Sequence, residues 1–364
     1  MQKISAVNLQ PGMVVARNIY SGDGLLLLNS GMELTEIFID RLKKLGISSI
    51  YIENPFLRNI EIPEAVREET RLRAVGLVQK SFAELKMSSR LNIQQLQQAA
   101  NDIVAELLNS RQAMIHLSDI RTHDTYTFSH SVNVCILSTI TGLQLGYNTD
   151  KLKDLALGSL LHDAGKALVP LEILNKPGRL TDEEMAVMKT HTEMGFDMLR
   201  DQLAQVPLLA AHVAFQHHEK LDGSGYPRGL IDNEIHEYAK IAAIADVYDA
   251  LTADRPYRKR MPAHQAYELV VALANSHFDT TILSTFLSNV AVYPIGSFIA
   301  LNTGEIGIVT NVIPKLPTRP TIKVITDSAG KILANQHEIN LIEHLTLFVS
   351  SVLSERDILD LKLI

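Results

Sequence analysis

The amino-acid sequence predicts a mainly α-helical protein with a small α+β region at its N-terminus and a small β region at its C-terminus. Three observations support this fold class. Residues 112–290 carry apolar residues at helical spacing in one segment after another, separated by short loops that contain Pro and Gly. Residues 1–55 mix strand-like and helix-like segments. After about Tyr293, the hydrophobic pattern changes to period two.

The first 55 residues predict a hairpin, a helix and a returning strand. The segments MVVARNIY and LLLL flank the turn SGDG, and SSIYIE has the composition of a strand. The helix TEIFIDRLKKLG has Thr35 as its candidate N-cap and Gly46 as its stop. We find no catalytic pattern here, and we treat residues 1–55 as a small α+β domain of unassigned role, with docking or dimer formation as a hypothesis.

Residues 56–115 predict linking helices. In the second helix an a/d stripe lasts about two heptads and consists of Ile93, Leu96, Ala100, Ile103 and Leu107. Two interpretations stay open. The helix packs on the next domain, or residues 64–110 form the seam of a homodimer.

Residues 291–364 predict two β-hairpins and a short helical end. The hairpins turn at Thr303-Gly304 and near Ala329-Gly330, where glycine follows a polar or small residue between two strand-like runs.

Composition limits the function classes. The 364 residues are enough for two or three domains, and the net charge of −7 excludes a basic field for non-specific binding of a nucleic-acid polymer. The single cysteine, Cys135, excludes an intrachain disulfide and is expected in the core. We see no secretory signal and no run of ~18 apolar residues, so we expect a cytoplasmic protein without a membrane span.

Histidine is distributed unevenly along the chain. None of the 13 histidines precedes His116, and eleven lie between His116 and His277. Any metal or acid–base chemistry is therefore expected in the middle of the chain, residues 116–290.

Five predicted helices of this region each place His or Asp in an apolar context. The candidates are His130, His162, Asp163, His191, His217, His218 and Asp246. A buried carboxylate is costly unless it is paired or binds a metal. Seven ligands exceed the needs of one ion, whereas two ions bridged by a carboxylate would use them.

A His/Asp set without cysteine suits Fe, Mn, Co or Zn. Two ions about 3.5–4 Å apart can activate a bridging hydroxide and neutralise a phosphodiester. The residues thus predict a dinuclear hydrolase that acts on a phosphate ester, with Lys166 on the helix face of His162.

At these segments the chain resembles the HD-GYP domain proteins, a bacterial branch of the HD phosphohydrolase superfamily. The resemblance covers roughly residues 116–290, with Gly225, Tyr226 and Pro227 as the GYP. The matching stretches, in family order and spacing, are YTFSHSVNV, LLHDAGKALVPLEILNKPGRLT, HTEMG, HHEKLDGSGYPRGL and IADVYDALTADRPYRKRM.

The resemblance implies an all-α HD-type catalytic domain and a role for each matching residue. One metal would be held by His130, His162, Asp163 and Asp246, and the other by Asp163, His191, His217 and His218, with Asp163 bridging. Lys166 would contact the scissile phosphate, and Asp163 and Lys166 would be the catalytic pair. Arg255 and Arg258 would help to hold the phosphates and bases of the substrate. Tyr226 would order the loop over the site.

The resemblance also implies a reaction. Members are phosphodiesterases that open cyclic di-GMP to linear pGpG, and some continue to GMP, by attack of a metal-bridging hydroxide. Fe or Mn is the expected metal. Some members add a third ion through a Glu four residues before the first His ligand, where this chain has Tyr126. We therefore expect two ions and pGpG as the main product, although Asp124 is a nearby carboxylate.

Three rival functions remain to be tested. The first is hydrolysis of another cyclic dinucleotide, such as cyclic GMP-AMP. The second is a non-catalytic cyclic di-GMP receptor, which the complete ligand set argues against. The third, nucleic-acid binding, is disfavoured by the charge. Four histidines outside the motifs are expected to be structural or surface residues, with His123 left open: His212, His236, His264 and His277.

Overall fold

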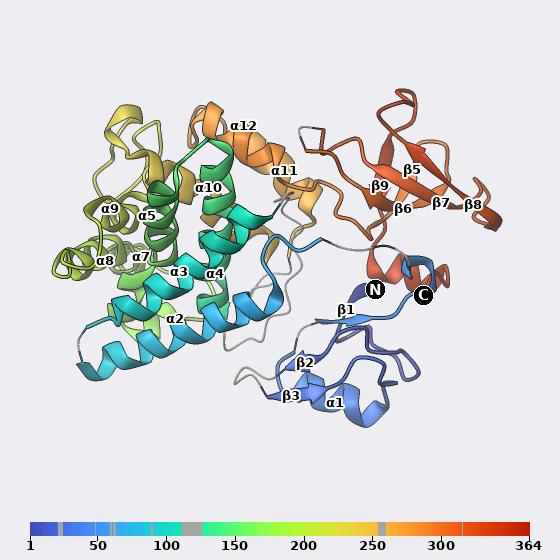
Figure 1. The fold of residues 1–364 in the computed structure, drawn as a ribbon, viewed down its shortest axis with the longest axis horizontal. Helices are drawn as coiled ribbons and strands as arrows, with labels where there is room; N and C mark the ends of the chain where they lie inside the picture. The colour runs from blue at the N-terminus through green and yellow to red at the C-terminus, as the bar shows by residue number, and fades with distance from the viewer. Residues whose placement is uncertain are drawn as a thin grey trace. The chain divides into compact units, whose positions relative to one another are not determined.

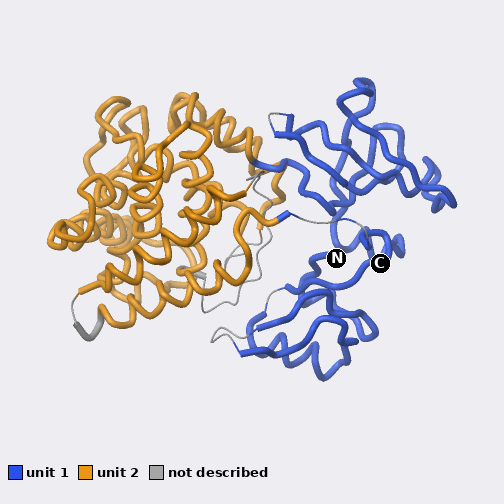
Figure 2. Tube along the Cα trace, viewed as in Figure 1, with its two compact units in different colours: residues 1–63, 114–126, 290–364 blue, residues 64–113, 127–289 orange. Residues whose placement is uncertain are grey.

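The computed structural model describes the chain except residues 21–24, 48, 59, 61–62, 89, 111–125, 254–259 and 315, and the side chains of residues 86–88 and 126–127. The chain divides into two compact units (Figure 2). Unit 1 comprises residues 1–63, 114–126 and 290–364, and unit 2 comprises residues 64–113 and 127–289.

Unit 2 is built from helices, as Figure 1 shows, and the mainly α fold class is confirmed. Its elements are α2 (Glu68–Ser88), α3 (Ile93–Asn109), α4 (Tyr126–Gln144), α5 (Thr149–Leu160), η3 (Ala164–Leu168), α6 (Leu171–Leu174), α7 (Asp182–Lys189), α8 (His191–Arg200), α9 (Leu208–Gln216), η4 (Asp232–Glu234), α10 (Glu237–Thr252), α11 (Ala263–Ala272) and α12 (Thr280–Ser288).

Helix α10 lies in the interior of unit 2, where it contacts α5, α9, α11 and α12. Its sequence is rich in alanine, and small side chains allow neighbouring helices to approach closely. Two carboxylates, Asp246 and Asp249, are nevertheless buried on this helix. Such groups need partners, because an unpaired buried charge is strongly destabilising.

The stripe on α3 is buried within the chain. Each of its five members is at most 1% exposed, and α3 packs on α2 and α5. The stripe therefore packs against neighbouring helices of the same chain. The alternative, that this stripe forms the seam of a homodimer, is wrong, because its apolar surface is already covered. A homodimer through other surfaces of residues 64–110 stays a prediction.

Two of the segments that carry apolar residues at helical spacing, residues 151–165 and 181–200, do not form continuous helices. In residues 151–165 the α-helix ends at Leu160 and a 3₁₀ turn follows, and in residues 181–200 the helix breaks at Thr190. At Thr190 the hydroxyl donates to the carbonyl oxygen of Val187 at 2.6 Å, which is a local bond that competes with the helical ladder. Both interruptions lie beside candidate ligands.

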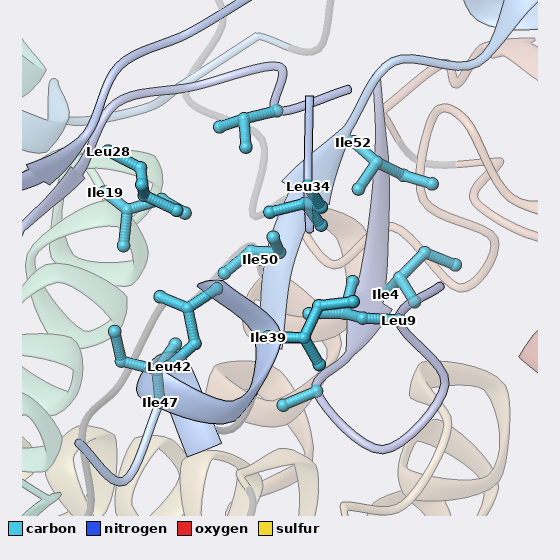
Figure 3. Close-up of a cluster of buried hydrophobic side chains, with 12 residues drawn as sticks. Ile4, Leu9, Ile19, Leu28, Leu34, Ile39, Leu42, Ile47, Ile50 and Ile52 are labelled. Carbon is cyan, nitrogen blue, oxygen red and sulfur yellow. The ribbon is translucent and has the colours of Figure 1, made fainter. Parts of the chain in front are cut away.

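Unit 1 contains the predicted N-terminal helix and hairpin. Helix α1 (Glu36–Lys44) begins at Thr35, whose hydroxyl accepts from the backbone N–H of Phe38, and Gly46 follows its end with φ +71°. Strands β2 (Ile19–Tyr20) and β3 (Leu26–Leu28) pair antiparallel, as do β1 (Gln2–Ser5) and β4 (Ser49–Ile52). Buried Ile and Leu side chains from these elements form one cluster, shown in Figure 3.

The C-terminal part of unit 1 is an antiparallel sheet of five strands in the order β8-β7-β6-β5-β9. Both predicted hairpins are present, and a strand and helix follow them. The elements are β5 (Phe298–Leu301), β6 (Ile306–Asn311), β7 (Thr321–Thr326), β8 (Ile332–Asn340), β9 (Val349–Val352) and α13 (Glu355–Asp360).

The end of the chain packs on its beginning within unit 1. The carboxylate of Glu355 accepts from the backbone N–H of Ser5 at 2.9 Å and from the amide of Asn8 at 2.8 Å. The amide of Asn54, just before the 3₁₀ turn η1 (Pro55–Leu57), donates to the carbonyl of Leu363 at 2.7 Å. Among the described residues, no helix is long and apolar enough to span a bilayer.

Candidate metal centre

Asp163 lies at the centre of the candidate site, in the turn between α5 and η3, and is 4% exposed. Gly165 sets the position of this turn. A Cβ atom at residue 165 would lie 1.9 Å from the carbonyl oxygen of His191, so a side chain there would force η3 away from α8. Glycine therefore permits the close approach that places Asp163 beside His191.

The two carboxylate oxygens of Asp163 face two different pairs of imidazoles. Oδ2 lies 3.3 Å from Nε2 of His162 and 3.8 Å from Nε2 of His130. Oδ1 lies 3.4 Å from Nε2 of His191 and 3.7 Å from Nε2 of His217. One buried carboxylate thus lies between two sets of nitrogen ligands, which is the geometry that a bridging ligand needs.

Asp246 adds a second carboxylate from α10. Its Oδ1 lies 3.1 Å from Nε2 of His130, and its Oδ2 lies 3.9 Å from Nδ1 of His218. All seven sequence-predicted ligands therefore converge. Three groups have ligand atoms within 4.8 Å of one another: Asp163, His191, His217 and His218; His130, His162 and Asp163; and His162, His217 and Asp246.

Backbone carbonyls fix the orientation of three imidazoles. The Nδ1 atoms of His162, His191 and His217 lie 2.8, 2.7 and 3.1 Å from the carbonyl oxygens of Ser159, Met188 and Val213. A carbonyl oxygen can only accept a hydrogen bond, so these Nδ1 atoms carry the proton and the Nε2 lone pairs face the centre. The Nε2 atoms of His191 and His217 lie only 3.5 Å apart, and a cation between them would satisfy both lone pairs.

Two further atoms of the centre lack hydrogen-bond partners in the described part of the chain. Nε2 of His162 and Oδ1 of Asp163 are both buried and unsatisfied. Leaving such a group unpaired costs about 1–3 kcal/mol, and a metal ion would ligate both atoms. The residues therefore fit a metal ion, and a nitrogen and oxygen donor set without sulfur suits Fe, Mn, Co or Zn.

The carboxylates of the centre are ionised. Burial alone would raise the pKa of Asp163, but Lys166 and His162 outweigh it and hold that pKa well below its usual range. Burial likewise opposes ionisation of Asp246, and the hydrogen bond from His130 outweighs it. The centre thus presents two negative charges to a cation.

Most of the imidazoles are neutral. Burial lowers the pKa of His191 to about 4, and burial also lowers the pKa values of His217 and His218. His130 behaves differently. Burial lowers its pKa, but hydrogen bonds with Asp246 and Asp249 outweigh this effect and raise it to about 9. Metal ligation at His130 would replace the proton that its Nε2 carries in the metal-free chain.

Lys166 lies at the border between the centre and solvent. Its Nζ is 2.6 Å from Oδ2 of Asp163, and its side chain is 28% exposed. The sequence-based expectation that Lys166 follows His162 on one α-helical face is wrong, because this segment is a 3₁₀ turn. The three-residue spacing from Asp163 provides the contact instead. An exposed ammonium beside the ligands can reach a bound anion.

Tyr226 covers the other side of the centre. Its ring stacks on His218, with centroids 4.7 Å apart and an interplanar angle of 29°. Nζ of Lys189 lies 5.0 Å from the centroid of the same ring, at cation–π distance. The loop therefore places an aromatic ring next to the candidate ligands, and α7 places a lysine over that ring.

Glu219 holds this loop in place. It is 4% exposed, and its two oxygens accept from the backbone N–H groups of Arg228 at 2.8 Å and Leu230 at 2.9 Å. Gly225 packs against the start of the loop, where a Cβ atom would lie 2.4 Å from the backbone nitrogen of Lys220. Any side chain at residue 225 would displace the loop.

The other residues that the sequence singled out lie outside the described part of the chain or outside its metal-ligating groups. Arg255, Arg258, His123 and Asp124 lie outside the described residues, and the side chain of Tyr126 is not described. Cys135 is buried, as expected. None of the metal-ligating groups found among the described residues contains His212, His236, His264 or His277.

Sequence reasoning missed three residues of the site: Asn133, Glu219 and Asp249. Asp249 follows Asp246 by three residues in an apolar helix, and the argument that selected Asp246 applies to it equally. No comparable signal identifies Asn133 or Glu219, because ordinary polar residues show their partners only in the folded chain.

Two family models match different parts of the chain. A model described as HD domain matches residues 102–282, and a model described as KOW domain associated with HD domain matches residues 298–361. The first covers the metal centre and the second covers the five-stranded sheet.

The chain is similar to several curated proteins. It is 35% identical over 289 residues to cyclic di-GMP phosphodiesterase PA4108 of Pseudomonas aeruginosa, covering 79% of this chain and 69% of that protein. It is 31% identical over 212 residues to the cyclic di-GMP phosphodiesterase response regulator RpfG of Xanthomonas campestris, covering 54% of this chain and 56% of the relative. It is 37% identical over 167 residues to 3'3'-cGAMP-specific phosphodiesterase 1 of Vibrio cholerae, covering 46% of this chain and 38% of that protein. The chain thus spans less than two thirds of the latter two.

Among solved structures, the chain is similar to Bd1817, an HDG"Y"P protein from Bdellovibrio bacteriovorus. The TM-score is 0.46 at 21% identity, with 79% of this chain and 98% of that chain covered.

Proposed function

Since the chain belongs to the HD-GYP cyclic di-GMP phosphodiesterase family of HD domain proteins, we propose that it hydrolyses cyclic di-GMP to linear pGpG in a metal-dependent reaction. The observation that carries the proposal is the position of Asp163. Its two oxygens face separate pairs of imidazole Nε2 atoms, and two of the atoms involved, Nε2 of His162 and Oδ1 of Asp163, are buried without a hydrogen-bond partner among the described residues.

Two metal ions would be held by these ligands. His130, His162, Asp163 and Asp246 form the proposed first site, and Asp163, His191, His217 and His218 form the second. When bound, Fe or Mn ions would act as Lewis acids on the phosphodiester and activate a water for attack on phosphorus. Backbone carbonyls orient three of the imidazoles before any ion arrives, so little reorganisation is needed.

Positive side chains would hold the phosphates. Lys166 would donate from Nζ to a non-bridging oxygen of the scissile phosphate, where negative charge increases in the transition state. Arg255 and Arg258 are proposed to bind the remaining phosphate and a guanine base. Tyr226 would close one side of the pocket by its stack on His218.

Cleavage is proposed to stop at pGpG. In the family resemblance a third ion depends on a Glu four residues before the first histidine, and this chain has Tyr126 at that position. A tyrosine hydroxyl that keeps its proton carries no negative charge, so it is a poorer metal ligand than the carboxylate of a Glu. Production of GMP as the main product would contradict this part of the proposal.

Cyclic GMP-AMP is a second candidate substrate. The similarity to the 3'3'-cGAMP-specific phosphodiesterase of Vibrio cholerae, at 37% identity over 167 residues, is the observation that favours it. The two dinucleotides differ in one base and share both phosphodiesters, so the metal centre would treat them alike. Discrimination would have to come from residues that contact the bases.

Turnover by the full chain, purified without oxygen and loaded with Fe or Mn, tests the proposal. Cyclic di-GMP and cyclic GMP-AMP are compared at equal concentration, with products separated by chromatography. Asp163→Asn is expected to abolish turnover, because an amide cannot bridge two cations as a carboxylate does. Asp197→Asn is the matched control, since this carboxylate on α8 is 59% exposed. It should behave as the native chain.

Each outcome decides between the candidate functions. Loss of cyclic di-GMP cleavage in Asp163→Asn alone supports the proposal, and preferential cleavage of cyclic GMP-AMP supports the second candidate. Tight binding of cyclic di-GMP by a metal-loaded chain that does not cleave it would instead indicate a receptor.

A further inference from the structure

Helix α10 carries a second buried carboxylate that the proposed reaction does not use. Asp249 is 0% exposed and lies three residues after Asp246. Its Oδ2 lies 2.7 Å from Nδ1 of His130, and its Oδ1 accepts from the side-chain amide of Asn133 at 2.8 Å. Asp249 therefore contacts the outer edge of a proposed ligand and belongs to none of the metal-ligating groups found among the described residues.

The contact determines which nitrogen of His130 can bind a metal. A carboxylate can only accept hydrogen bonds, so Nδ1 of His130 must donate to Asp249. The other ring nitrogen, Nε2, then points toward Asp163 and Asp246, at 3.8 and 3.1 Å from their oxygens. Removing the acceptor at residue 249 would permit the opposite tautomer, in which Nε2 carries the proton and cannot ligate.

His130 differs in this respect from three other imidazoles of the centre. The Nδ1 atoms of His162, His191 and His217 are held by carbonyl oxygens one turn earlier in the same segment, which no side-chain substitution removes. His130 on α4 depends on a side chain of α10, 119 positions later in the chain. Among these four imidazoles, His130 is therefore the one whose Nδ1 partner a side-chain substitution can remove.

We propose that Asp249 is a positioning residue that fixes the tautomer and ring orientation of His130 and thereby controls occupancy of one of the two metal sites. This inference rests on the proposed function, because it uses the division of ligands into two sites. The affected site is the one of His130, His162, Asp163 and Asp246. The site of Asp163, His191, His217 and His218 keeps its ligands, and His191 and His217 keep their carbonyl partners.

Asp249→Asn tests the inference with almost no change in volume. The carboxylate accepts from two donors, whereas an amide offers one acceptor and one donor. The side-chain N–H of residue 249 would then point either at Nδ1–H of His130 or at the side-chain N–H of Asn133. A flip of the Asn133 amide is opposed by Arg71, whose Nη1 donates to Oδ1 of Asn133 at 3.4 Å.

A double variant can restore the hydrogen-bond acceptor for His130. In Asn133→Asp/Asp249→Asn, the new carboxylate at residue 133 accepts from the amide of residue 249, and the amide oxygen accepts from Nδ1–H of His130. Asn133→Ala is the matched control at the same place, because it removes a donor to Asp249 and leaves the acceptor of His130 intact.

The measurement is the number and affinity of Mn²⁺ ions per full-length chain, from equilibrium dialysis with elemental analysis. Circular dichroism verifies the fold of each variant. Electron paramagnetic resonance separates coupled ion pairs from isolated ions, which give a six-line signal.

We expect two ions in the native chain and in Asn133→Ala. In Asp249→Asn, affinity of one site should fall 10- to 100-fold, which is typical for loss of an outer-shell partner of a ligating histidine, and the isolated-ion signal should appear. The double variant should recover the second ion.

Three outcomes would overturn the inference. Asp249→Asn could keep two ions at native affinity, a folded Asp249→Asn could lose both sites equally, or the double variant could stay at one ion. If Asp249→Asn alone does not fold, the ion count of the double variant decides. A native chain that never holds two ions would overturn the proposed dinuclear site itself, which is a different result from two ions in both native chain and variant.

Discussion

At the scale of single residues, Gly165 shows how a missing Cβ brings the proposed metal ligands Asp163 and His191 together. We predict that Gly165→Ala lowers the free energy of unfolding by about 1–3 kcal/mol, which is the usual cost of forcing atoms into a packed interior. The displaced atom would be the carbonyl oxygen of His191, 1.9 Å from the new methyl group, so metal affinity should fall as well. Chemical denaturation and metal counting measure the two effects.

Gly76→Ala provides the control for this substitution. Gly76 lies within α2, and a Cβ atom there would have no neighbour within 4 Å. Alanine in a helix interior is favoured over glycine by about 0.5–1 kcal/mol, so this variant should be slightly more stable and bind metal normally. Equal metal loss in both variants would show that close packing at Gly165 is not the cause.

The buried histidines predict a pH dependence for the metal-free chain. His191 has its pKa lowered by burial from 6.5 to about 4, so between these values the unfolded chain binds a proton that the folded chain does not. Stability is therefore lost as the pH falls from 6.5 to about 4. His130 has its pKa raised to about 9, and the stability that it contributes is present below 6.5 and lost as the pH rises through 9.

These two histidines together place maximal stability of the metal-free chain near pH 6.5. Urea unfolding at pH 5, 6.5 and 9, with a chelator present, measures the curve. In His191→Gln the acid side should become flatter while the alkaline side is unchanged. A free energy of unfolding that rises steadily from pH 5 to pH 9 would contradict the assignment.

At the scale of elements, the sequence predicted most helices and both C-terminal hairpins, but not where the helices break. Hydrophobic periodicity continues through residues 151–165 and 181–200, so it cannot reveal the interruptions before Asp163 and His191. The two interrupted segments meet where η3 contacts α8, and these elements are distant in sequence. The ligands themselves were predictable, because His and Asp are conspicuous in apolar helices. Their partner Asp249 carried the same signal and was overlooked.

The loop that carries Tyr226 depends on one buried carboxylate. We predict that Glu219→Gln lowers the free energy of unfolding by about 1–3 kcal/mol, because an amide can accept from only one of the two N–H groups that Glu219 now binds. Hydrogen exchange of residues 220–231 should accelerate, and KM for the dinucleotide should rise more than kcat falls.

Glu234→Gln is the matched control for Glu219→Gln. Glu234 accepts from the backbone N–H of Ile231 at 2.9 Å in the same loop region, but it is exposed. Its replacement should change the free energy of unfolding by less than about 0.5 kcal/mol, as is usual for surface positions. Similar hydrogen exchange in both variants would show that burial of Glu219 is unimportant.

At the scale of the whole molecule, the two ends of the chain form one unit while the metal centre belongs to the other. From the sequence, residues 1–55 and 291–364 are predicted as separate domains, because no local pattern shows that Asn54 and Leu363 are hydrogen-bond partners. In the folded chain an apolar cluster joins Leu57, which follows this N-terminal segment, to the C-terminal part, and its other members are Phe298, Ile306, Ile308, Ile325, Ile358 and Leu363. All seven proposed metal ligands lie in unit 2.

Metal removal should therefore destabilise one unit and spare the other. A ligand that binds only the folded state stabilises it by about 2.7 kcal/mol when present at 100 times its Kd, and this applies to each occupied site. We expect calorimetry of the Mn²⁺-loaded chain to show two transitions, of which a chelator lowers only that of unit 2. Ile358 lies in the core of unit 1. Its replacement by Ala should lower the free energy of unfolding of unit 1 by about 2–5 kcal/mol, and so lower the temperature of the other transition, while the metal content stays unchanged. If the chelator and Ile358→Ala instead shift the same transition, the units unfold together. Metal binding in unit 2 would then stabilise unit 1 as well, because a single cooperative transition distributes the binding free energy over the entire chain.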